Sequence, residues 1–385
     1  MKNNKLRVLH VIKTLSLGGA EVNLFNLSQA IDTNKFEIHI GYSYGGEFET
    51  RFKQLGVRLF KYSNTAYKVK SLASLIIIFR ILRYIFKNKI QIVHTHNFNA
   101  HVWGGIAARL SGVKVIEHVH DYRYEEPLYL EKRGVRPDQF RLAKYFAKLS
   151  DSIVVLTKNN KNLLLRNRIA SDRKIKMLLN GINPKFNQSV DGYELRKKHC
   201  IPADRRIIFA AARISQEKNI GAVIDIAEIS VQRCDKVIFV IAGDGPLKNE
   251  LEENVKKRNL DNIVRFIGFC PNVKEFLKIS NIFIQPTLLE LHSITMIEAM
   301  SMGVPVLVSQ GVGCNDYFIT HGENGFLLDP YKPEVWAQTI NLLLDNQSLS
   351  NTIGNAGSKL IENECDIKKT VKNIENLYYD LVSTM

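Results

Sequence analysis

The sequence predicts an α/β protein made of two Rossmann-like, doubly wound domains that face each other across a cleft. Its 385 residues, of which 45% are apolar, suit two globular domains better than one. Short apolar runs alternate with helical patterns, and this alternation restarts near the middle of the chain. Such alternation is typical of βαβ units around a parallel sheet, so the restart indicates a second, separate α/β domain.

The expected elements follow in order along each half of the chain. In the first half, strands are expected at 7–12, 36–43, 90–96, 113–120 and 151–157, with helices at 20–31 and 104–112. In the second half, strands are expected at 206–213, 236–243, 263–269, 281–287 and 305–309, with helices at 219–230, 247–258, 273–280 and 294–303. Each strand is a short apolar run, and each helix carries apolar residues at helical spacing.

A turn-rich connection marks the boundary between the two domains. Asn180-Gly181 and Pro184 are residues that favour turns, so the domains are expected at 1–183 and 184–367. The end of the chain shows helical periodicity with an apolar face. It predicts a C-terminal helix at about 368–385 that packs back on the first domain.

The composition favours a reduced, cytosolic protein. Five cysteines are present, an odd number, and their spacing does not suit a metal site. Basic residues precede an apolar run of six residues at the N-terminus, but this run is too short for a signal peptide and no cleavage-site pattern follows. We interpret the run as the first strand.

The net charge of +15 is distributed unevenly along the chain. Between Glu49 and Glu117 there are twelve Lys or Arg residues and no carboxylate. Within this gap, segment 67–90 joins an apolar body to six basic residues: Lys68, Lys70, Arg80, Arg83, Lys87 and Lys89. Helices of this kind bind anionic membrane surfaces, although a core-facing helix with a solvated basic face explains the same pattern. The apolar part is too short to cross a membrane, and no nucleic-acid-binding motif accompanies the charge.

Three strand-to-helix loops carry candidate residues toward the expected cleft. Gly18 and Gly19 follow the first strand, where glycine lets the backbone approach a ligand and a helix start presents N–H groups to an anion. Arg213 and Lys218 follow a strand of the second domain, and two such cations suit the oxygens of a diphosphate. The turn 243–245 (Gly-Asp-Gly) is similarly placed. Each motif also has a purely structural explanation. It is a plain loop for the two glycines, solvated surface charge for the two cations, and a tight turn with positive φ for 243–245.

The stretch LLELHSITMIEAMSMGVPVLVS, residues 288–309, carries two glutamates with seven residues between them. Ser293 is a good N-cap for a helix that would leave the N–H groups of Ile294-Thr295 open to a phosphate. Glu298 would then lie inside the helix and suit the diol of a ribose. Glu290 would lie in the preceding loop and suit sugar hydroxyls.

Together these motifs resemble glycosyltransferase family 4. The resemblance rests on the Gly-rich first loop, Arg213 with Lys218, AGDGP, VRFIGF, the two glutamates followed by AMSMGVPV, and ENGFLL, in this order over nearly the whole chain. It implies the GT-B fold, with an acceptor-binding first domain and a nucleotide-sugar-binding second domain. It also implies a retaining, hexosyltransferase-type enzyme of bacterial surface-polysaccharide synthesis that needs no cofactor and no metal. The chain contains no Asp-x-Asp pair to hold one.

The resemblance implies roles for single residues. Arg213 and Lys218 would neutralise the leaving diphosphate, Glu298 would bind the ribose, and Glu290 would lie beside the donor sugar. His120 would contact that sugar, with His118 as the competing choice. Further donor contacts are implied at the following residues: Gly18, Gly19, Gly243, Asp244, Phe269, Cys270, Pro271, His292, Ser293, Ile294 and Thr295.

The chain departs from the family pattern in one loop. Where members have Gly-Phe-Gly after the first glutamate, this chain has Leu291-His292-Ser293, so a bulkier and more polar sugar-facing loop is expected. In the first domain, the sequence HTHNFNAHVWGG offers His96, Asn97 and Asn99 as acceptor-binding residues. Their polar side chains suit a polyhydroxy acceptor.

The sequence therefore predicts transfer of a sugar from a UDP-sugar donor to a carbohydrate acceptor. Retention by same-face attack is expected, because we identify no carboxylate at a strand end of the first domain that would serve as a nucleophile. A lipid-linked glycan precursor is the expected acceptor, used by an enzyme held peripherally at the inner face of the cytoplasmic membrane. Two alternatives stay open: a UDP-sugar epimerase of GT-B fold, and a non-catalytic, membrane-associated sugar-binding protein.

Overall fold

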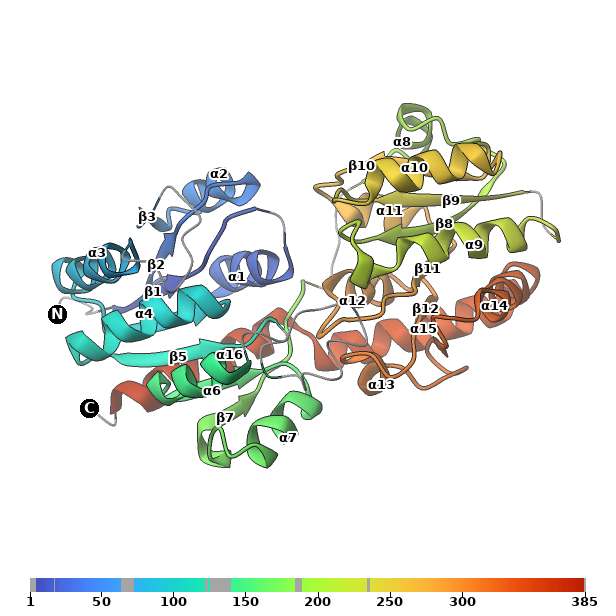
Figure 1. Ribbon diagram of the computed structural model, residues 1–385. Coiled ribbons are helices and arrows are strands. Elements are labelled where there is room, and N and C mark those ends of the chain that lie inside the picture. Colours follow the sequence, from blue (N-terminus) through green and yellow to red (C-terminus); the bar gives the residue numbers. More distant parts are fainter. Residues whose placement is uncertain are drawn as a thin grey trace. The chain divides into compact units, whose positions relative to one another are not determined.

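The computed structural model describes residues 5–16, 18–63, 73–121, 124, 140–183, 189–233 and 236–383. Contacts within the chain divide it into two compact units (Figure 1). Unit 1 extends to Ile182 and includes the chain from Ile367 onward, and unit 2 contains Asn183–Asp366. Each unit is a parallel sheet with helices on both faces, which confirms the predicted class of two doubly wound α/β domains.

Unit 1 contains a seven-stranded sheet in the order β3-β2-β1-β4-β5-β6-β7. Its strands are β1 (Leu6–Val11), β2 (Phe36–Tyr42), β3 (Arg58–Lys61), β4 (Ile92–His96), β5 (Lys114–His118), β6 (Ser152–Val155) and β7 (Ile175–Met177). The strand order reverses direction between β1 and β4. In doubly wound sheets, ligands bind outside the carboxyl ends of the strands at such a switch point.

The helices of unit 1 cover two apolar layers. They are α1 (Gly19–Ala30), α2 (Glu47–Gln54), α3 (Ala73–Asn88), α4 (Phe98–Ser111), α6 (Phe140–Phe146), α7 (Lys158–Arg166) and α16 (Ile367–Ser383), with short 3-10 turns at Ala147–Leu149 and Asp172–Lys174. Side chains alternate along the strands: Val8 and Ile92 pack in the layer with α1 and α16, while Leu9 and Val93 pack in the layer with α3 and α4.

The last helix, α16, packs on the core of unit 1. Its buried residues recur at helical spacing: Ile367, Val371, Ile374, Leu377 and Tyr378. Two hydrogen bonds attach its first turn, because the Ile367 N–H donates to the Ile182 carbonyl at 3.0 Å and the Thr370 hydroxyl donates to the Leu179 carbonyl at 3.2 Å. The end of the chain therefore supplies side chains to the layer that also holds α1.

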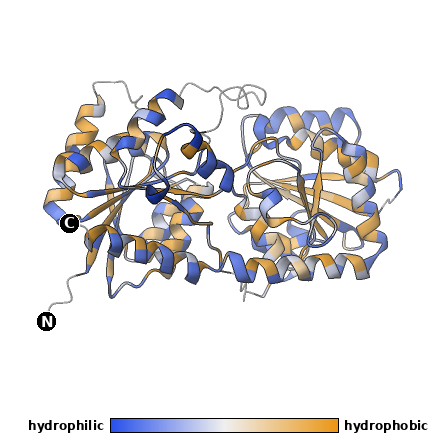
Figure 2. Ribbon diagram, turned by 90° about the horizontal axis from the view of Figure 1, so that it is seen from below, coloured by the Kyte–Doolittle hydropathy of each residue, from blue (hydrophilic) through white to orange (hydrophobic). Residues whose placement is uncertain are grey.

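Unit 2 contains a six-stranded sheet in the order β10-β9-β8-β11-β12-β13, with its switch point between β8 and β11. Its strands are β8 (Arg206–Ala211), β9 (Val237–Ala242), β10 (Val264–Gly268), β11 (Ile282–Gln285), β12 (Val306–Ser309) and β13 (Phe326–Leu328). Every residue of β9 is apolar and buried, as expected for a central strand covered on both faces (Figure 2).

The helices of unit 2 lie on both sides of this sheet (Figure 1). They are α8 (Gly192–Lys198), α9 (Ile220–Ser230), α10 (Lys248–Lys257), α11 (Val273–Lys278), α12 (Ile294–Ser301), α13 (Asn315–Phe318), α14 (Pro333–Asp345) and α15 (Gln347–Glu364), with a 3-10 turn at Gln216–Lys218. On one face Phe209 of β8 stacks on Phe276 of α11, with 5.5 Å between ring centroids. Among the described residues of both units, no helix is long and apolar enough to span a lipid bilayer.

Candidate functional site

The switch point of unit 2 brings the two predicted cations into the loops that follow β8. Arg213 is exposed in the loop directly after the strand, and Lys218 ends the short 3-10 turn. The Lys218 Nζ lies 2.8 Å from Glu290 Oε2 in the loop after β11, and both side chains are less than one-fifth exposed. The structure therefore pairs two predicted site residues that are 72 positions apart in sequence. Because the pair is shielded from water, the Coulomb attraction between its two charges is stronger than in a surface ion pair.

Close backbone approach explains the glycines of the AGDGP turn. Gly243 has φ +145°, and a Cβ placed there would lie 1.9 Å from the Ala212 carbonyl oxygen. A Cβ on Gly245 would lie 2.3 Å from the carbonyl oxygen of Ile214. The two glycines therefore let the turn after β9 pack against the loop that carries Arg213. The tight-turn explanation is confirmed for Gly243, and the exposed Asp244 is held beside the same loop by its own carbonyl, which accepts the N–H of Ile214 at 2.9 Å.

The helix predicted to follow Glu290 begins as expected. Ser293 is its N-cap, and the hydroxyl accepts the N–H of Met296 at 3.1 Å. The first backbone N–H groups of α12, at Ile294 and Thr295, have no partner within the helix by its geometry. With the positive end of the helix dipole, they form a site suited to an anion.

The two glutamates of this segment do not form an acid/base pair with each other. Glu290 pairs with Lys218, whereas the Oε1 of Glu298 lies 3.7 Å from the Nζ of Lys274 at the start of α11. Burial raises the pKa of Glu298, and the nearby Lys274 partly opposes this effect. Lys274 was not identified from the sequence, because nothing in its local pattern distinguishes it from a surface lysine.

The departure from the family at Leu291-His292-Ser293 does not produce the bulkier, more polar loop surface that we expected. All three side chains are buried, and the His292 ring packs edge-on against Phe318 with 5.5 Å between centroids. Burial lowers the pKa of His292 to about 4. The expectation was wrong because the side chain enters the protein interior.

The loop after β10 presents an aromatic surface. Phe269 is 40% exposed, Pro271 is exposed, and Cys270 between them is partly buried. The Gly268 carbonyl accepts the N–H of Gly243 at 2.8 Å, which joins this loop to the AGDGP turn. The loops after β8, β9 and β10 are therefore linked at one edge of the unit 2 sheet.

In unit 1, the predicted glycine loop lies against a buried acid, Glu21, that was not identified from the sequence. Gly18 is the N-cap of α1 and Gly19 its first residue. A Cβ on Gly18 would lie 2.5 Å from the Oε2 of Glu21, which is only 5% exposed. Burial raises the pKa of Glu21 to about 7. An acidic residue in the first turn after a Gly-Gly pair is the signal that was available in the sequence.

Five histidines gather at the switch point of unit 1. They are His10 of β1, His94 and His96 of β4, His118 of β5, and His120 just beyond β5. The strand pairing places His10 beside His94 and His96 beside His118. Because side chains alternate along a strand, each His-x-His pair presents both rings to the same face. His120 is partly exposed and His118 is only 4% exposed, which favours His120 as the ring that meets a substrate.

The predicted acceptor residues differ in their placement. His96 is fully buried, and both of its ring nitrogens contact other histidines, so direct contact with an acceptor is ruled out for this side chain. The prediction failed because an alternating polar strand can face the interior when its polar groups bond to one another. Asn97 and Asn99 are partly exposed, and the Asn97 Oδ1 accepts the N–H of Lys13 at 3.1 Å.

Two groups of three histidines have ring nitrogens within 4.8 Å of one another: His10, His94 and His96, and His96, His118 and His120. Imidazole is a common ligand of zinc and copper, so these are the described residues of unit 1 that could hold a metal ion. In the structure, however, His10, His96 and His120 use ring nitrogens to contact one another.

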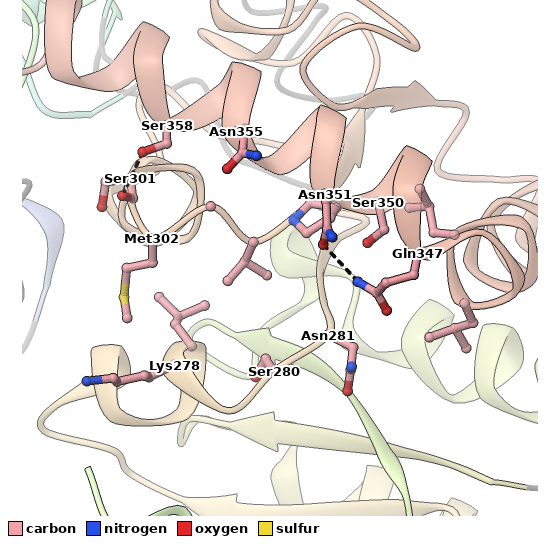
Figure 3. A pocket seen from close by; sticks show the side chains of 16 residues that line it. Lys278, Ser280, Asn281, Ser301, Met302, Gln347, Ser350, Asn351, Asn355 and Ser358 are labelled. Atoms are coloured by element: carbon pink, nitrogen blue, oxygen red, sulfur yellow. Dashed lines mark hydrogen bonds between the residues drawn. The ribbon is translucent and has the colours of Figure 1, made fainter. Parts of the chain in front are cut away.

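A pocket of about 490 Å³ lies at the opposite edge of the unit 2 sheet (Figure 3). It includes Asn281 and Pro305, which precede β11 and β12, so it lies away from the carboxyl ends of the strands. Two hydrogen bonds join polar groups that line it: Gln347 donates to Asn351, and Ser358 donates to the Ser301 carbonyl. We therefore place the candidate site at the other edge of the sheet.

The outer face of α3 is apolar as well as basic. Ile77, Ile81 and Ile85 are buried in the core. Four apolar side chains on the same helix are more than half exposed: Leu75, Ile76, Phe79 and Phe86. Arg83 and Lys87 are exposed close to them in helical projection. The helix thus has the predicted core face and a second, exposed face that is apolar as well as basic, which a helix in contact with water alone would not need. Lys68 and Lys70 lie outside the described residues.

Comparisons with known proteins agree with this geometry. Family models match residues 17–186 (Glycosyltransferase Family 4) and residues 192–360 (Glycosyl transferases group 1). The chain is 25% identical over 389 residues to the UDP-Gal:alpha-D-GlcNAc-diphosphoundecaprenol alpha-1,3-galactosyltransferase of Escherichia coli, with 99% of this chain and 98% of the relative covered. It is 26% identical to the capsular polysaccharide biosynthesis glycosyltransferase CapM of Staphylococcus aureus, with 64% and 68% covered.

Solved structures show the same fold. Anabaena HepE, determined in complex with UDP and glucose, matches with a TM-score of 0.84 at 19% identity, over 97% of this chain and 99% of HepE. TarM matches with a TM-score of 0.78 at 14% identity, over 98% and 100%. The two family models together span most of both units, and the order of the motifs is that of the family. The chain is therefore a glycosyltransferase of GT-B fold and belongs to glycosyltransferase family 4.

Proposed function

We propose that this protein transfers a sugar from a UDP-sugar to a lipid-linked glycan precursor, with retention of anomeric configuration. The observation that carries the proposal is the arrangement at the unit 2 switch point. There Lys218, in the segment after β8, pairs with Glu290 in the loop after β11. The start of α12 follows Glu290 at the end of the same loop. A cation, a carboxylate and free N–H groups are the groups that a nucleotide-linked sugar requires.

Departure of the diphosphate is the step that these groups would assist. As the glycosidic bond breaks, negative charge builds on the diphosphate, and fixed cations and helix N–H groups stabilise that charge without reorganising. Lys218 has three N–H donors. Glu290 accepts one of them and the Leu289 carbonyl accepts another at 3.4 Å, which leaves one for a phosphate oxygen. Arg213 would contribute a planar guanidinium from the loop after β8. With this charge compensation, the proposed mechanism requires no metal ion.

The remaining contacts of the donor follow from the same edge of the sheet. Glu298 would accept hydrogen bonds from the ribose hydroxyls, and Lys274 would keep its carboxylate charged enough to do so. The exposed ring and backbone of Phe269, Cys270 and Pro271 would receive the base. The complexes of HepE with UDP and UDP-glucose support uridine as the nucleotide.

The acceptor is proposed from two independent features. The E. coli relative is named for an undecaprenol-diphosphate-linked acceptor, and CapM is named for capsular polysaccharide biosynthesis. The outer face of α3 combines exposed apolar side chains with Arg83 and Lys87, as expected of a helix that lies on an anionic lipid surface. We place the protein at the inner face of the cytoplasmic membrane, where such a lipid-linked acceptor would be reached.

A donor screen tests the proposal. The full chain is incubated with each common UDP-sugar and a panel of undecaprenol-diphosphate-linked monosaccharides and disaccharides, and the product mass and the release of UDP are measured. We expect one donor to extend one acceptor by a single sugar, and NMR of the product to show the anomeric configuration of the donor. Inverted configuration would contradict the mechanism.

The same screen separates the alternatives. A UDP-sugar epimerase would release UDP or change the sugar in the absence of any acceptor. A non-catalytic sugar-binding protein would give no product with any pair, and its ligand binding would survive the change Glu290→Gln. Either outcome would replace the proposed function.

A further inference from the structure

A second, smaller pocket of unit 2 lies at the carboxyl ends of β11, β12 and β13. Its volume is about 250 Å³. Leu288 follows β11, Gln310 directly follows β12, and Asp329 directly follows β13. The other lining residues are Val312, Pro330 and Tyr331. The pocket is therefore at the edge of the sheet where doubly wound folds bind their ligands.

The strand order places this pocket next to the loop of Glu290. The order is β10-β9-β8-β11-β12-β13, and the proposed donor contacts follow it: the base after β10, the diphosphate after β8, and the donor sugar after β11. A Cβ on Gly313 would lie 2.1 Å from the Glu290 carbonyl oxygen, and the Leu291 carbonyl accepts the N–H of Cys314 at 2.9 Å. The segment after β12 thus packs on the Glu290 loop. A group in the pocket would lie beyond the donor sugar, at the far end from the base.

The lining of the pocket suits a sugar ring. Tyr331 is 70% exposed, so its ring is available to a ligand. The face of an aromatic ring carries partial negative charge, which attracts the C–H groups on one side of a pyranose. Gln310 has an amide that donates and accepts hydrogen bonds, and Asp329 has a carboxylate that accepts them. Apolar and polar groups therefore match the two kinds of surface on a sugar.

The loop that carries Tyr331 is held in place by hydrogen bonds. The Tyr331 N–H donates to the Oδ1 of Asp329 at 3.0 Å, and the Trp336 Nε1–H donates to the Asp329 carbonyl at 2.8 Å. The N–H of Gln310 donates to the Leu328 carbonyl at 2.9 Å, which joins the loops after β12 and β13. A ligand does not have to order this surface, and such preorganisation favours binding.

Charge and size both favour an uncharged, single sugar over a phosphate. The six lining residues include one carboxylate and no basic side chain. The Oδ2 of Asp329 lies 3.9 Å from the Nζ of Lys332, and the two side chains are 44% and 65% exposed, so this surface pair is weak and leaves the carboxylate available. Pockets for drug-sized ligands measure roughly 300–1,000 Å³, and this pocket is smaller.

We propose that this pocket binds the acceptor sugar that receives the transferred sugar, with Tyr331 stacked on its ring and with Asp329 and Gln310 bonded to its hydroxyl groups. The inference rests on the proposed function for the role of that sugar in the reaction. Recognition of a neutral sugar by the pocket does not depend on it. The assignment adds acceptor contacts on unit 2 to those predicted on unit 1 at Asn97 and Asn99.

Kinetics test the role in the reaction, with the donor and acceptor found by the screen. Tyr331→Ala is expected to raise the KM for the acceptor about tenfold and to leave the KM for the donor unchanged, because only the stacking surface is lost. Tyr331→Phe keeps the ring and the wild-type KM. Asp329→Asn keeps an oxygen for the Tyr331 N–H and raises the acceptor KM about fivefold. Tyr193→Ala, at a 67% exposed tyrosine of α8, is the matched control.

NMR provides a readout that needs no activity. The full chain, labelled with carbon-13 in its tyrosine rings, is titrated with the methyl glycosides of glucose, galactose and N-acetylglucosamine without any donor. The signals of Tyr331 are those that disappear in Tyr331→Phe, and those of Tyr193 are assigned in the same way. We expect at least one glycoside to shift the Tyr331 signals and to leave those of Tyr193 in place.

Three results would overturn the inference. An unchanged acceptor KM in Tyr331→Ala would remove the pocket from the reaction. A raised donor KM with an unchanged acceptor KM would give the pocket to the donor sugar. Unshifted Tyr331 signals with all three glycosides would show that the pocket does not recognise sugars. Shifted signals in a protein without any transfer activity would instead overturn the proposed function and leave the sugar site in place.

Discussion

The two units have different side chains at the switch point of the same type of sheet: charged pairs in unit 2 and histidine rings in unit 1. At the switch point of unit 2, lysines and glutamates form two pairs, Lys218 with Glu290 and Lys274 with Glu298. At the switch point of unit 1, imidazole rings contact one another nitrogen to nitrogen. Both sheets are parallel and doubly wound, so the architecture does not decide the difference. We propose that the side chains at the strand ends suit unit 2 to an anionic ligand and unit 1 to hydrogen bonds with hydroxyl groups.

The largest expected effect comes from removing a cation of unit 2. Lys218→Ala takes a fixed charge away from the developing diphosphate, and the transfer rate is expected to fall about 10²- to 10³-fold. The measurement is kcat/KM with the donor and acceptor of the screen. Lys332→Ala, which removes an exposed lysine near Asp329 of the same unit, is the matched control and keeps the wild-type rate. A loss of less than about threefold in Lys218→Ala would show that the charge of unit 2 is not used in the reaction.

The buried acid of unit 1 sharpens the comparison, because Glu21 contacts no cation among the described residues. Its pKa is about 7 in the folded protein, against 4.5 as the ordinary value. Stability is therefore lost as the pH rises from about 4.5 through 7. Glu21→Gln removes this loss. The free energy of unfolding of the variant minus that of the wild type is therefore expected to increase by up to roughly 3 kcal/mol between pH 4.5 and pH 8.

Urea unfolding at the two pH values measures this change. Glu47→Gln, at an exposed acid of α2 in the same unit, is the matched control. An equal difference between Glu21→Gln and wild type at both pH values would contradict a raised pKa for Glu21.

In unit 2, the buried ring of His292 is an exception to the pairing of polar groups. Neither ring nitrogen has a hydrogen-bond partner among the described residues of the loop and its surroundings. His292→Phe is expected to stabilise the protein by about 1–2 kcal/mol at pH 7, since it removes an unsatisfied polar ring from an aromatic contact with Phe318.

The pH dependence of the same variant provides a second check. The pKa of His292 is about 4 in the folded protein, below the ordinary 6.5, so the wild type loses stability as the pH falls from about 6.5 to 4. The gain of His292→Phe in the free energy of unfolding should therefore be larger at pH 5 than at pH 7. A gain that shrinks at pH 5 would show that the ring is protonated and bonded.

The smallest expected effect concerns the outer face of α3. Arg83→Gln is expected to weaken binding to vesicles that contain anionic lipid about fivefold at low salt, which corresponds to about 1 kcal/mol for one basic residue near the surface. Sedimentation with vesicles measures this change. Lys372→Gln, at an exposed lysine of α16 in the same unit, should not alter binding. Equal binding to neutral and anionic vesicles would rule out a charge-dependent membrane contact.

Much of the fold follows from local patterns in the sequence. The expected strand at 236–243 is β9, because all its residues are apolar, and Ser293 was recognised as an N-cap by its side-chain oxygen. The edge strands β3, β7 and β13 were not predicted. They contain only three or four residues, some of them partly exposed, whereas the equally short β6, β11 and β12 are buried throughout and lie within longer apolar runs.

The site was predictable only in part. Lys218 and Glu290 were identified as residues of one site because each follows a strand of the same predicted domain. The contact between Tyr378 and His94 joins residues 284 positions apart, and no periodic signal in the sequence links them. The burial of His96 and His292 depends on which face of the local structure packs inward. Tertiary packing decides that choice, and polarity alone predicted the opposite.

Binding of UDP tests the division of chemistry between the units most directly. Isothermal titration calorimetry compares the wild type with Lys218→Ala and His120→Ala. We predict that Lys218→Ala weakens UDP binding about tenfold or more, because a charge-assisted hydrogen bond to phosphate is lost. His120→Ala should bind UDP with the wild-type Kd, because its proposed contact is to the sugar that UDP lacks. Weakening by His120→Ala as large as that by Lys218→Ala, or an unchanged Kd in Lys218→Ala, would contradict the account.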